Sequence, residues 1–393
     1  MNPALFQSPR RLREPSVALV CLFACAGFAA EADPISTPPG PPIGLLTEFQ
    51  VDPLAIDQMK PRLSWQVQDR DRGERQTAYQ ILVASDPTAL STDRGERWDS
   101  GRVTAAPSTA VQYAGQELKP DQRSWWKVRT WDKDGKASPY SEPARFDTGI
   151  GMTGEAAWTA KFIWDGTEFI RSGSKNIPPK GINDYAYFRK EFTLPKGLKL
   201  RSAKLFASAH NVYQLHLDGT ELGYGPARSN PFLYGQYNVY DLTDQLAAGN
   251  HCLAARCHWM GTWGDSGVNA APAFIAELRL VFSDGSKMTV VTDPTWKTLA
   301  ATPYDEEKPV LFGSAGGKNN RSAERFDARK EPLGWLKAGF DDGAWIAASE
   351  VKRAFHLYAQ VTPRSRIQHV IEPVKITQDG NGIELSCSGV IHL

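Results

Sequence analysis

The segment Ser124-Trp125-Trp126-Lys127-Val128-Arg129-Thr130-Trp131 is the clearest guide to the fold of this chain. Successive side chains of a β-strand point to opposite faces, so a period of two with aromatic and β-branched residues is typical of a strand with one buried face. The same pattern recurs in Leu63–Gln68 and Ala78–Ala84. Several short strands in about 100 residues predict a β-sandwich over residues 43–149.

A second and larger sandwich is predicted over residues 155–352. A cluster of Gly151, Thr153 and Gly154 marks the boundary before it. Its strands are joined by turns such as Asp218-Gly219 and Asp284-Gly285, a dipeptide that is typical of hairpins. The alternating or apolar segments are Tyr187–Leu194, Ala203–Ala209, Tyr213–Leu217, Cys252–Cys257, Phe274–Phe282 and Met288–Val291. The chain is therefore predicted to be all-β, with a short β stub over residues 356–393.

The first residues have the layout of a secretory signal peptide, predicted over residues 1–30. Arg10, Arg11 and Arg13 precede the apolar stretch Ser16–Phe28, and the small residues Ala29 and Ala30 follow it. A proline-rich lead-in occupies residues 31–42. The sequence therefore predicts an exported protein, in the periplasm, on the cell surface or in the medium. Whether the signal is that of a lipoprotein stays open.

Composition excludes several classes of protein. The chain has 393 residues and a net charge of +1, which suggests two or three domains and argues against a nucleic-acid partner. No apolar stretch long enough for a membrane-spanning helix follows the N-terminus. Cys252 and Cys257 have an odd spacing that places them on opposite faces of one strand, so buried free thiols are expected.

Catalytic motifs are missing from the sequence. There is no G-x-S-x-G nucleophile elbow, no H-E-x-x-H zinc motif and no P-loop. The carboxylate doublets Glu306-Glu307 and Asp341-Asp342 are poor glycosidase candidates, because neighbours on a turn point in different directions. We predict neither a catalytic residue nor a metal ligand.

One segment suggests a binding surface. Trp259 and Trp263 lie in the glycine-rich stretch 258–267, and Asp265 lies beside them. Aromatic faces stack on the apolar face of sugar rings, and nearby polar groups bind the hydroxyls. Arg228 and Asn230, in a second polar loop, could supply such groups. The alternative is that both tryptophans pack at the end of the sandwich or against a neighbouring domain.

Several motifs, in this order, resemble the N-terminal part of bacterial α-L-rhamnosidases of glycoside hydrolase family 78. The region from Trp125 to Gly149 also resembles the last hairpin of a fibronectin type III or Ig-like domain. The motifs that carry the rhamnosidase resemblance, over roughly residues 42–375, are Pro61–Trp65, Gln76–Ser85, Trp98–Gly101, Trp126–Asp132, Phe188–Phe192, Tyr240–Thr243, Glu324–Arg329 and Phe340–Trp345.

The resemblance implies a fibronectin type III/Ig-like sandwich followed by a galactose-binding-like jelly-roll sandwich. It also implies that the catalytic (α/α)6 barrel of the family is missing, because its acidic motif is not found in this sequence. No catalytic residue is carried over. Some members bind rhamnose and calcium in this region, but the resemblance places no calcium ligand on a residue here. A rhamnose-containing glycan and a separate catalytic chain are the partners that it suggests.

Three functions remain open from the sequence. The first is a non-catalytic N-terminal fragment of a secreted α-L-rhamnosidase with an accessory or carbohydrate-binding role. The second is a free-standing secreted sugar-binding or adhesion module. The third is a hydrolase with a site between the sandwiches, which requires a carboxylate pair facing a cleft.

Overall fold

The computed structural model describes twelve segments of the chain. They are residues 37–151, 158–166, 184–227, 234–259, 271–299, 302–304, 310–312, 321–323, 326–352, 356–364, 373–379 and 382–387. The predicted signal peptide, residues 1–30, lies outside them.

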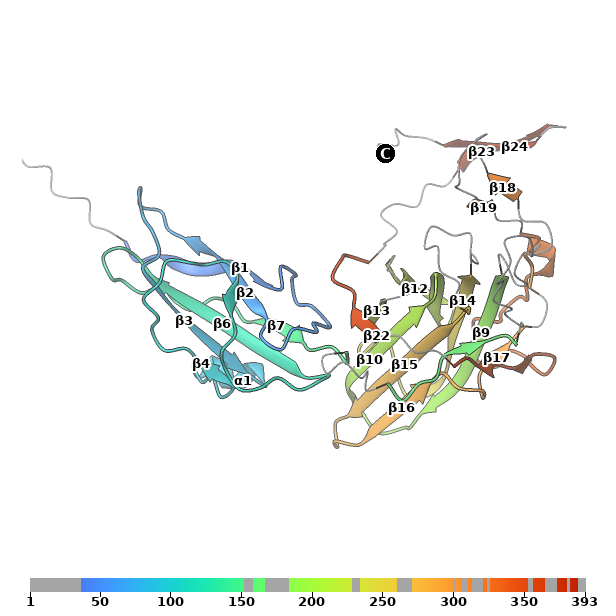
Figure 1. The fold of residues 1–393 in the computed structure, drawn as a ribbon, viewed down its shortest axis with the longest axis horizontal. Coiled ribbons are helices and arrows are strands. Elements are labelled where there is room, and N and C mark those ends of the chain that lie inside the picture. The colour runs from blue at the N-terminus through green and yellow to red at the C-terminus, as the bar shows by residue number, and fades with distance from the viewer. Residues whose placement is uncertain are drawn as a thin grey trace, which may run out of the picture. The chain divides into compact units, whose positions relative to one another are not determined.

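The first sandwich consists of two antiparallel sheets (Figure 1). One sheet has the order β1-β2-β5 and the other β4-β3-β6-β7. The elements are β1 Gly40–Thr47, β2 Arg62–Gln68, β3 Ala78–Ala84, α1 Pro87–Ser91, β4 Trp98–Asp99, β5 Val111–Gln112, β6 Arg123–Trp131 and β7 Ala144–Asp147.

The alternation in the sequence builds the core of this sandwich. Trp126 and Val128 of β6 lie on the inner face and pack with Trp65 of β2 and Ile81 of β3. Lys127 points to the other face, where its ammonium group donates a hydrogen bond to the carbonyl of Leu90 in α1. Each strand thus has an apolar side towards the opposite sheet, as its period of two predicts.

The second sandwich has larger sheets. One has the order β21-β8-β15-β10-β13-β22 with β16 beside β15, and the other has the order β12-β11-β14-β9-β17-β20. The strands are β8 Ile163–Trp164, β9 Asp184–Leu194, β10 Leu200–Ala209, β11 Val212–Leu217, β12 Thr220–Gly225, β13 Tyr234–Asp241, β14 Gly249–Trp259, β15 Phe274–Phe282, β16 Lys287–Val291, β17 Lys297–Thr298, β20 Ile346–Ala347, β21 Ser349–Glu350 and β22 His356–Ala359. The all-β fold predicted from the sequence is confirmed.

Strand β14 shows how the core of the second sandwich is filled. Cys257 and Trp259 belong to the central core between the sheets, whereas Cys252 lies in a separate cluster on the other face. Both cysteines are buried and free, as predicted. The outer face of this sheet is covered by a segment that contains the short 3₁₀ helix η2, Ala328–Lys330, and the buried Trp335.

The C-terminal part contains short additional sheets. β18 Val310–Phe312 pairs with β19 Arg321–Ala323, and β23 Pro373–Asp379 pairs with β24 Gly382–Cys387. β22, in contrast, pairs in parallel with β13 and so extends a sheet of the second sandwich. The stub predicted from residue 356 therefore begins with a strand of that sheet, and the predicted domain boundaries stay predictions.

Charged and hydroxyl groups join the two sandwiches within one unit of the fold, residues 38–393. Tyr237 of β13 accepts a hydrogen bond from the Ile150 amide at 2.9 Å and donates one to Asp57 Oδ1 at 3.1 Å. Gly149 lies against this pair, and a Cβ atom there would lie 2.0 Å from Asp57 Oδ1. Only glycine fits the connecting segment at this position, because any side chain would displace Asp57 or Tyr237.

Candidate functional site

The five residues predicted to bind sugar are only partly described by the structure. Arg228, Asn230, Trp263 and Asp265 lie outside the described residues. Trp259 is the last residue of β14 and is 1% exposed within the core of the second sandwich. The strand extends through it and pairs it with Asp184 of β9, so the alternation turns its ring inward. This placement favours the packing alternative for Trp259.

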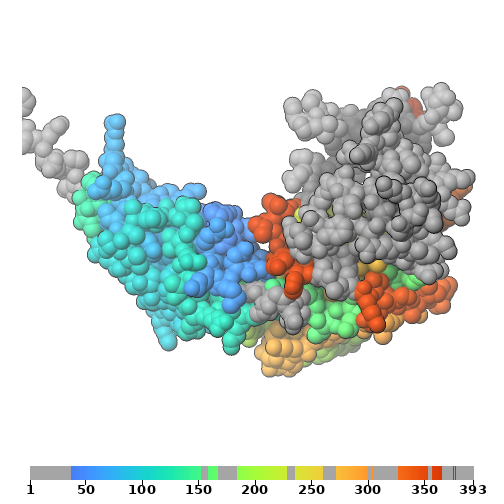
Figure 2. Space-filling model, viewed as in Figure 1, coloured from blue at the N-terminus to red at the C-terminus, as the bar shows by residue number. Residues whose placement is uncertain are grey.

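A groove between segments of the two sandwiches is a better candidate for a binding site. It has a volume of about 530 Å³ and lies between residues 48–62 and residues 358–362, whose segments are coloured blue and red in Figure 2. Its lining is Glu48, Phe49, Gln50, Ala55, Ile56, Asp57, Gln58, Arg62, Gln236, Tyr358, Ala359, Val361 and Thr362. The combination of exposed aromatic rings and amide side chains is typical of small polar ligand sites.

The first wall of the groove depends on an unusual turn after β1. Glu48 and Phe49 have φ angles of 50° and 61°, a left-handed conformation that costs free energy for residues other than glycine. The turn leaves the Phe49 ring 54% exposed, with the Arg62 guanidinium 4.8 Å from its centroid. Arg62 also donates from Nε to Glu48 Oε2 at 3.1 Å. The ion pair thus holds the turn that presents the ring.

The second wall comes from β22. Leu357 and Ala359 are buried, and Tyr358 between them is 42% exposed because alternate side chains of a strand point to opposite faces. Val361, 58% exposed, continues the same wall. The groove therefore has aromatic side chains on two walls that come from distant parts of the chain.

Asp57 lies at the base of the groove. Burial raises the pKa of its carboxyl group, and hydrogen bonds from the Ala359 amide and the Tyr237 hydroxyl lower it in part. Both of its oxygens accept hydrogen bonds, Oδ1 from Tyr237 and Oδ2 from Ala359. Asp57 is thus tied to the structure that joins the sandwiches.

The chemistry of the groove favours binding over hydrolysis. A glycosidase requires one carboxyl group to protonate the leaving oxygen and a second to act as base or nucleophile. The two carboxylates in the groove lining are Glu48 and Asp57. Glu48 is fully engaged by Arg62, and Asp57 by Tyr237 and the Ala359 amide. Each oxygen of both carboxylates thus already accepts a hydrogen bond from the protein.

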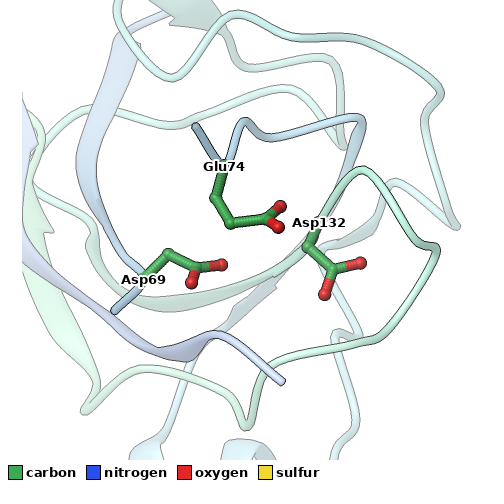
Figure 3. Close-up of side chains that lie close together, drawn as sticks. All are labelled: Asp69, Glu74 and Asp132. Atoms are coloured by element: carbon green, nitrogen blue, oxygen red, sulfur yellow. The ribbon is translucent and has the colours of Figure 1, made fainter. Parts of the chain in front are cut away.

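A separate group of residues could hold a metal ion. Asp69, Glu74 and Asp132 of the first sandwich place one carboxylate oxygen each within 4.8 Å of the others (Figure 3). In the part of the chain that the structure describes, this is the one group of three or more such ligands.

Sequence reasoning missed Phe49, Tyr358 and the acidic group. Phe49 lies in an irregular segment and Tyr358 in a four-residue strand, so no local pattern distinguishes either of them. The left-handed turn at Glu48 has no glycine or asparagine to indicate it.

Comparison with known families identifies the region to which these sandwiches correspond. The model of the Rha78A-like N-terminal immunoglobulin domain matches residues 42–151. The model of the alpha-L-rhamnosidase N-terminal domain matches residues 198–369. The chain is an N-terminal region of the family 78 α-L-rhamnosidases.

Relatives and solved structures agree with this assignment. An α-L-rhamnosidase of Formosa agariphila is 28% identical and is matched over 86% of this chain and 37% of its own length. One of Streptomyces avermitilis is 31% identical over 77% of this chain and 26% of its own length. The structure of the α-L-rhamnosidase from Dictyoglumus thermophilum is 28% identical, covers 86% of this chain and 37% of its own, and gives a TM-score of 0.73. That of the Streptomyces avermitilis enzyme complexed with L-rhamnose, 23% identical with a TM-score of 0.70, covers 86% of this chain and 48% of its own and shares the fold.

The chain spans only part of these proteins, 26% to 37% of the length of the two curated relatives. In the described residues, no helix has the length and apolar character needed to cross a membrane.

Proposed function

We propose that this α-L-rhamnosidase region is a non-catalytic module that binds rhamnose-containing glycans. The observation that carries the proposal is the groove with Phe49 and Tyr358 exposed on its two walls. The relatives support the ligand class, because those with 28% and 31% identity are α-L-rhamnosidases. The engaged state of Glu48 and Asp57 supports a role without catalysis.

The proposed recognition uses two kinds of contact. The C–H face and the methyl group of a 6-deoxy sugar lie against the rings of Phe49 and Tyr358. The hydroxyl groups exchange hydrogen bonds with Gln50, Gln58 and Gln236, which line the same groove. Sugar binding removes the apolar face of an exposed ring from water. An exposed ring therefore contributes more free energy to binding than a ring that is already buried.

Calorimetric titration of the purified chain with a rhamnosyl oligosaccharide tests the proposal. We expect Phe49→Ala and Tyr358→Ala each to weaken binding by about 1–3 kcal/mol, the range known for a base stacked on an aromatic ring and used here by analogy. Phe326→Ala is the matched control, because Phe326 is also 42% exposed but lies outside the groove. Unchanged affinity in both groove variants, with circular dichroism showing an intact fold, would contradict the groove as the sugar site.

The loop residues predicted from the sequence offer an alternative place for the same function. Trp263→Ala, with Arg228→Ala and Asn230→Ala, tests that place in the same titration. If these variants lose affinity and the groove variants do not, the glycan-binding site lies in the loop and not in the groove. The proposed carbohydrate-binding role would still hold.

The proposed cellular setting is export, supported by the layout of residues 1–30. Hydrolysis would then be performed by a catalytic domain, in the same polypeptide or in a separate chain, that acts on the glycan held here. We expect the purified chain alone to release no nitrophenol from a nitrophenyl rhamnoside, and turnover well above background would contradict its non-catalytic role.

A further inference from the structure

Two loops of the first sandwich meet beside the start of β3 and the end of β6. Asp69 directly follows β2, Glu74 lies in the loop that leads to β3, and Asp132 directly follows β6. The register of the sheet pairs Ala78, the first residue of β3, with Trp131, the last residue of β6, so both loops lie at the same end of this strand pair. Two hydrogen bonds fasten them together, from the Thr77 amide to the Trp131 carbonyl at 2.8 Å and from Thr77 Oγ1 to the Asp132 carbonyl at 2.6 Å.

The three side chains lie close together (Figure 3), with one carboxylate oxygen of each within 4.8 Å of the others. Calcium binds oxygen ligands at about 2.3–2.6 Å, so two ligands of one ion are separated by at most about 5 Å. The separation of the three oxygens thus lies inside the limit for a shared calcium ion. Calcium takes about six to eight oxygen ligands, so backbone carbonyls or water would complete the coordination.

Burial provides a second and independent indication. Asp132 is 2% exposed and the Glu74 side chain 4% exposed. Asp132 Oδ1 accepts a hydrogen bond from the Lys136 amide at 2.7 Å, and Glu74 Oε1 pairs with Lys133. The second oxygen of each side chain, Asp132 Oδ2 and Glu74 Oε2, is buried without a hydrogen-bond partner. Buried carboxylate oxygens are normally paired or coordinate a metal ion, so two of them in one group need a partner.

The group of three carboxylates has a net negative charge. Lys133 is ion-paired with Glu74, and its side chain is 41% exposed. Three carboxylates and one ammonium group leave an excess of two negative charges, which a divalent cation would balance.

We propose that Asp69, Glu74 and Asp132 form a calcium site that fastens the two loops together. The ligand set is entirely carboxylate oxygen, which suits calcium or magnesium and not zinc, copper or iron. Calcium fits better than magnesium, because it accepts irregular coordination by side chains from separate loops, whereas magnesium demands near-ideal octahedral geometry. The site is independent of the glycan groove and does not rest on the function proposed above.

Terbium luminescence with calcium competition, measured on the purified chain, tests the site. Trp131 precedes Asp132 in sequence and can sensitise a terbium ion held there. We expect calcium to displace terbium with a dissociation constant of about 0.1–1 mM, the range of extracellular calcium modules, and magnesium to compete at least tenfold more weakly. Wild-type protein without calcium-sensitive luminescence up to about 10 mM calcium would refute the site.

Two isosteric variants locate the ion. Asp132→Asn keeps the Oδ1 acceptor for the Lys136 amide but removes the charge, so the fold is retained and calcium affinity should fall at least tenfold. Asp134→Asn is the matched control, since Asp134 is exposed in the same turn but is not one of the three ligands. Its affinity should change less than threefold. Equal losses in both variants would mean a diffuse negative surface and would overturn the proposal.

Lys133→Met separates the site from its main alternative, in which Lys133 is itself the permanent counter-ion. If the carboxylates bind calcium, removing the competing ammonium should tighten calcium binding severalfold, and added calcium should raise the melting temperature of the variant. A variant that is destabilised and shows no response to calcium would establish the lysine as the counter-ion and refute the calcium site.

Discussion

The two ends of strand β6 carry acidic groups with opposite surroundings. At its start, where the two sandwiches meet, four carboxylates are matched by four cations, and the pairs are Arg123–Asp147, Arg123–Asp241, Arg145–Asp241, Lys204–Asp121, Lys204–Asp147, Arg279–Asp121 and Arg279–Glu277. Asp121 Oδ1 accepts no hydrogen bond there but is ion-paired with Lys204. At its other end, three carboxylates have one lysine beside them, and two buried oxygens have no hydrogen-bond partner. We call the first group saturated, because its carboxylates are matched by cations, and the second group unsaturated. Saturated carboxylates hold structural elements together, whereas unsaturated carboxylates are suited to bind a cation.

We predict the largest loss of stability when an ion pair in the saturated group, at the start of β6, is broken. Asp147 has a side chain that is 1% exposed, and it accepts hydrogen bonds from Arg123 Nε at 2.9 Å and Nη2 at 3.0 Å. Asp147→Asn leaves Arg123 and Lys204 without their buried charge partner. Because breaking a buried ion pair costs about 3–5 kcal/mol, we expect a loss of about 3 kcal/mol in the free energy of unfolding, measured by urea titration of tryptophan fluorescence.

Asp284→Asn is the control for this measurement. Asp284 lies in an exposed hairpin turn and accepts a hydrogen bond from the Ser286 amide through Oδ1, which asparagine retains. Its effect should stay below about 0.5 kcal/mol. A loss of less than about 1 kcal/mol in Asp147→Asn would show that the junction does not depend on this carboxylate.

Removing a neutral hydrogen-bond donor to a partly buried carboxylate should cause an intermediate loss in the free energy of unfolding. Asp57 accepts its hydrogen bonds from the Tyr237 hydroxyl and the Ala359 amide instead of from a cation. Tyr237→Phe leaves the Ile150 amide unpartnered and removes one of the hydrogen bonds that Asp57 accepts, and an unsatisfied buried group costs about 1–3 kcal/mol. We therefore expect urea unfolding to show a loss of about 2 kcal/mol and, because the hydroxyl lowers it, a further rise in the pKa of Asp57.

Tyr79→Phe is the matched variant for this comparison. Tyr79 is 9% exposed, and its hydroxyl group makes no hydrogen bond within the described residues. Removal of that hydroxyl should change the free energy of unfolding by less than about 0.5 kcal/mol. If both variants lose the same amount, the hydroxyl of Tyr237 has no special role at the junction.

The strands of these regions could be predicted from the sequence because their signal is local. The alternation in Ser124–Trp131 corresponds to β6, Arg123–Trp131, and that in Ala78–Ala84 to β3. The odd spacing of Cys252 and Cys257 correctly placed them on opposite faces of one strand. Period-two patterns depend only on neighbouring residues, so a single sequence contains them in full.

The groove and the acidic group could not be predicted, since both depend on contacts between distant segments. Asp57 and Ala359, which meet at the base of the groove, are 302 positions apart. Glu74 and Asp132 meet through the pairing of β3 with β6, and no local pattern specifies that pairing. For Trp259 the sequence left two placements open, a sugar-binding loop and packing in the sandwich. The alternation that begins at Cys252 extends to it and predicts an inward ring, but the glycines that follow it suggested a loop.

The smallest change in the free energy of unfolding, and the one with the opposite sign, is expected at the C-terminal end of β6, in the group of Asp69, Glu74 and Asp132, when metal is removed. In the presence of a chelator, Asp132→Asn should leave stability unchanged or raise it by up to about 1 kcal/mol, as measured by urea unfolding. Asparagine keeps the hydrogen bond to the Lys136 amide, and loss of one charge relieves the repulsion among three carboxylates that share one space. The same Asp→Asn change would then destabilise the protein by about 3 kcal/mol at one end of β6 and not at the other. A large loss at Asp132 in the chelated protein would mean that this end is saturated as well, and the contrast between the two groups would disappear.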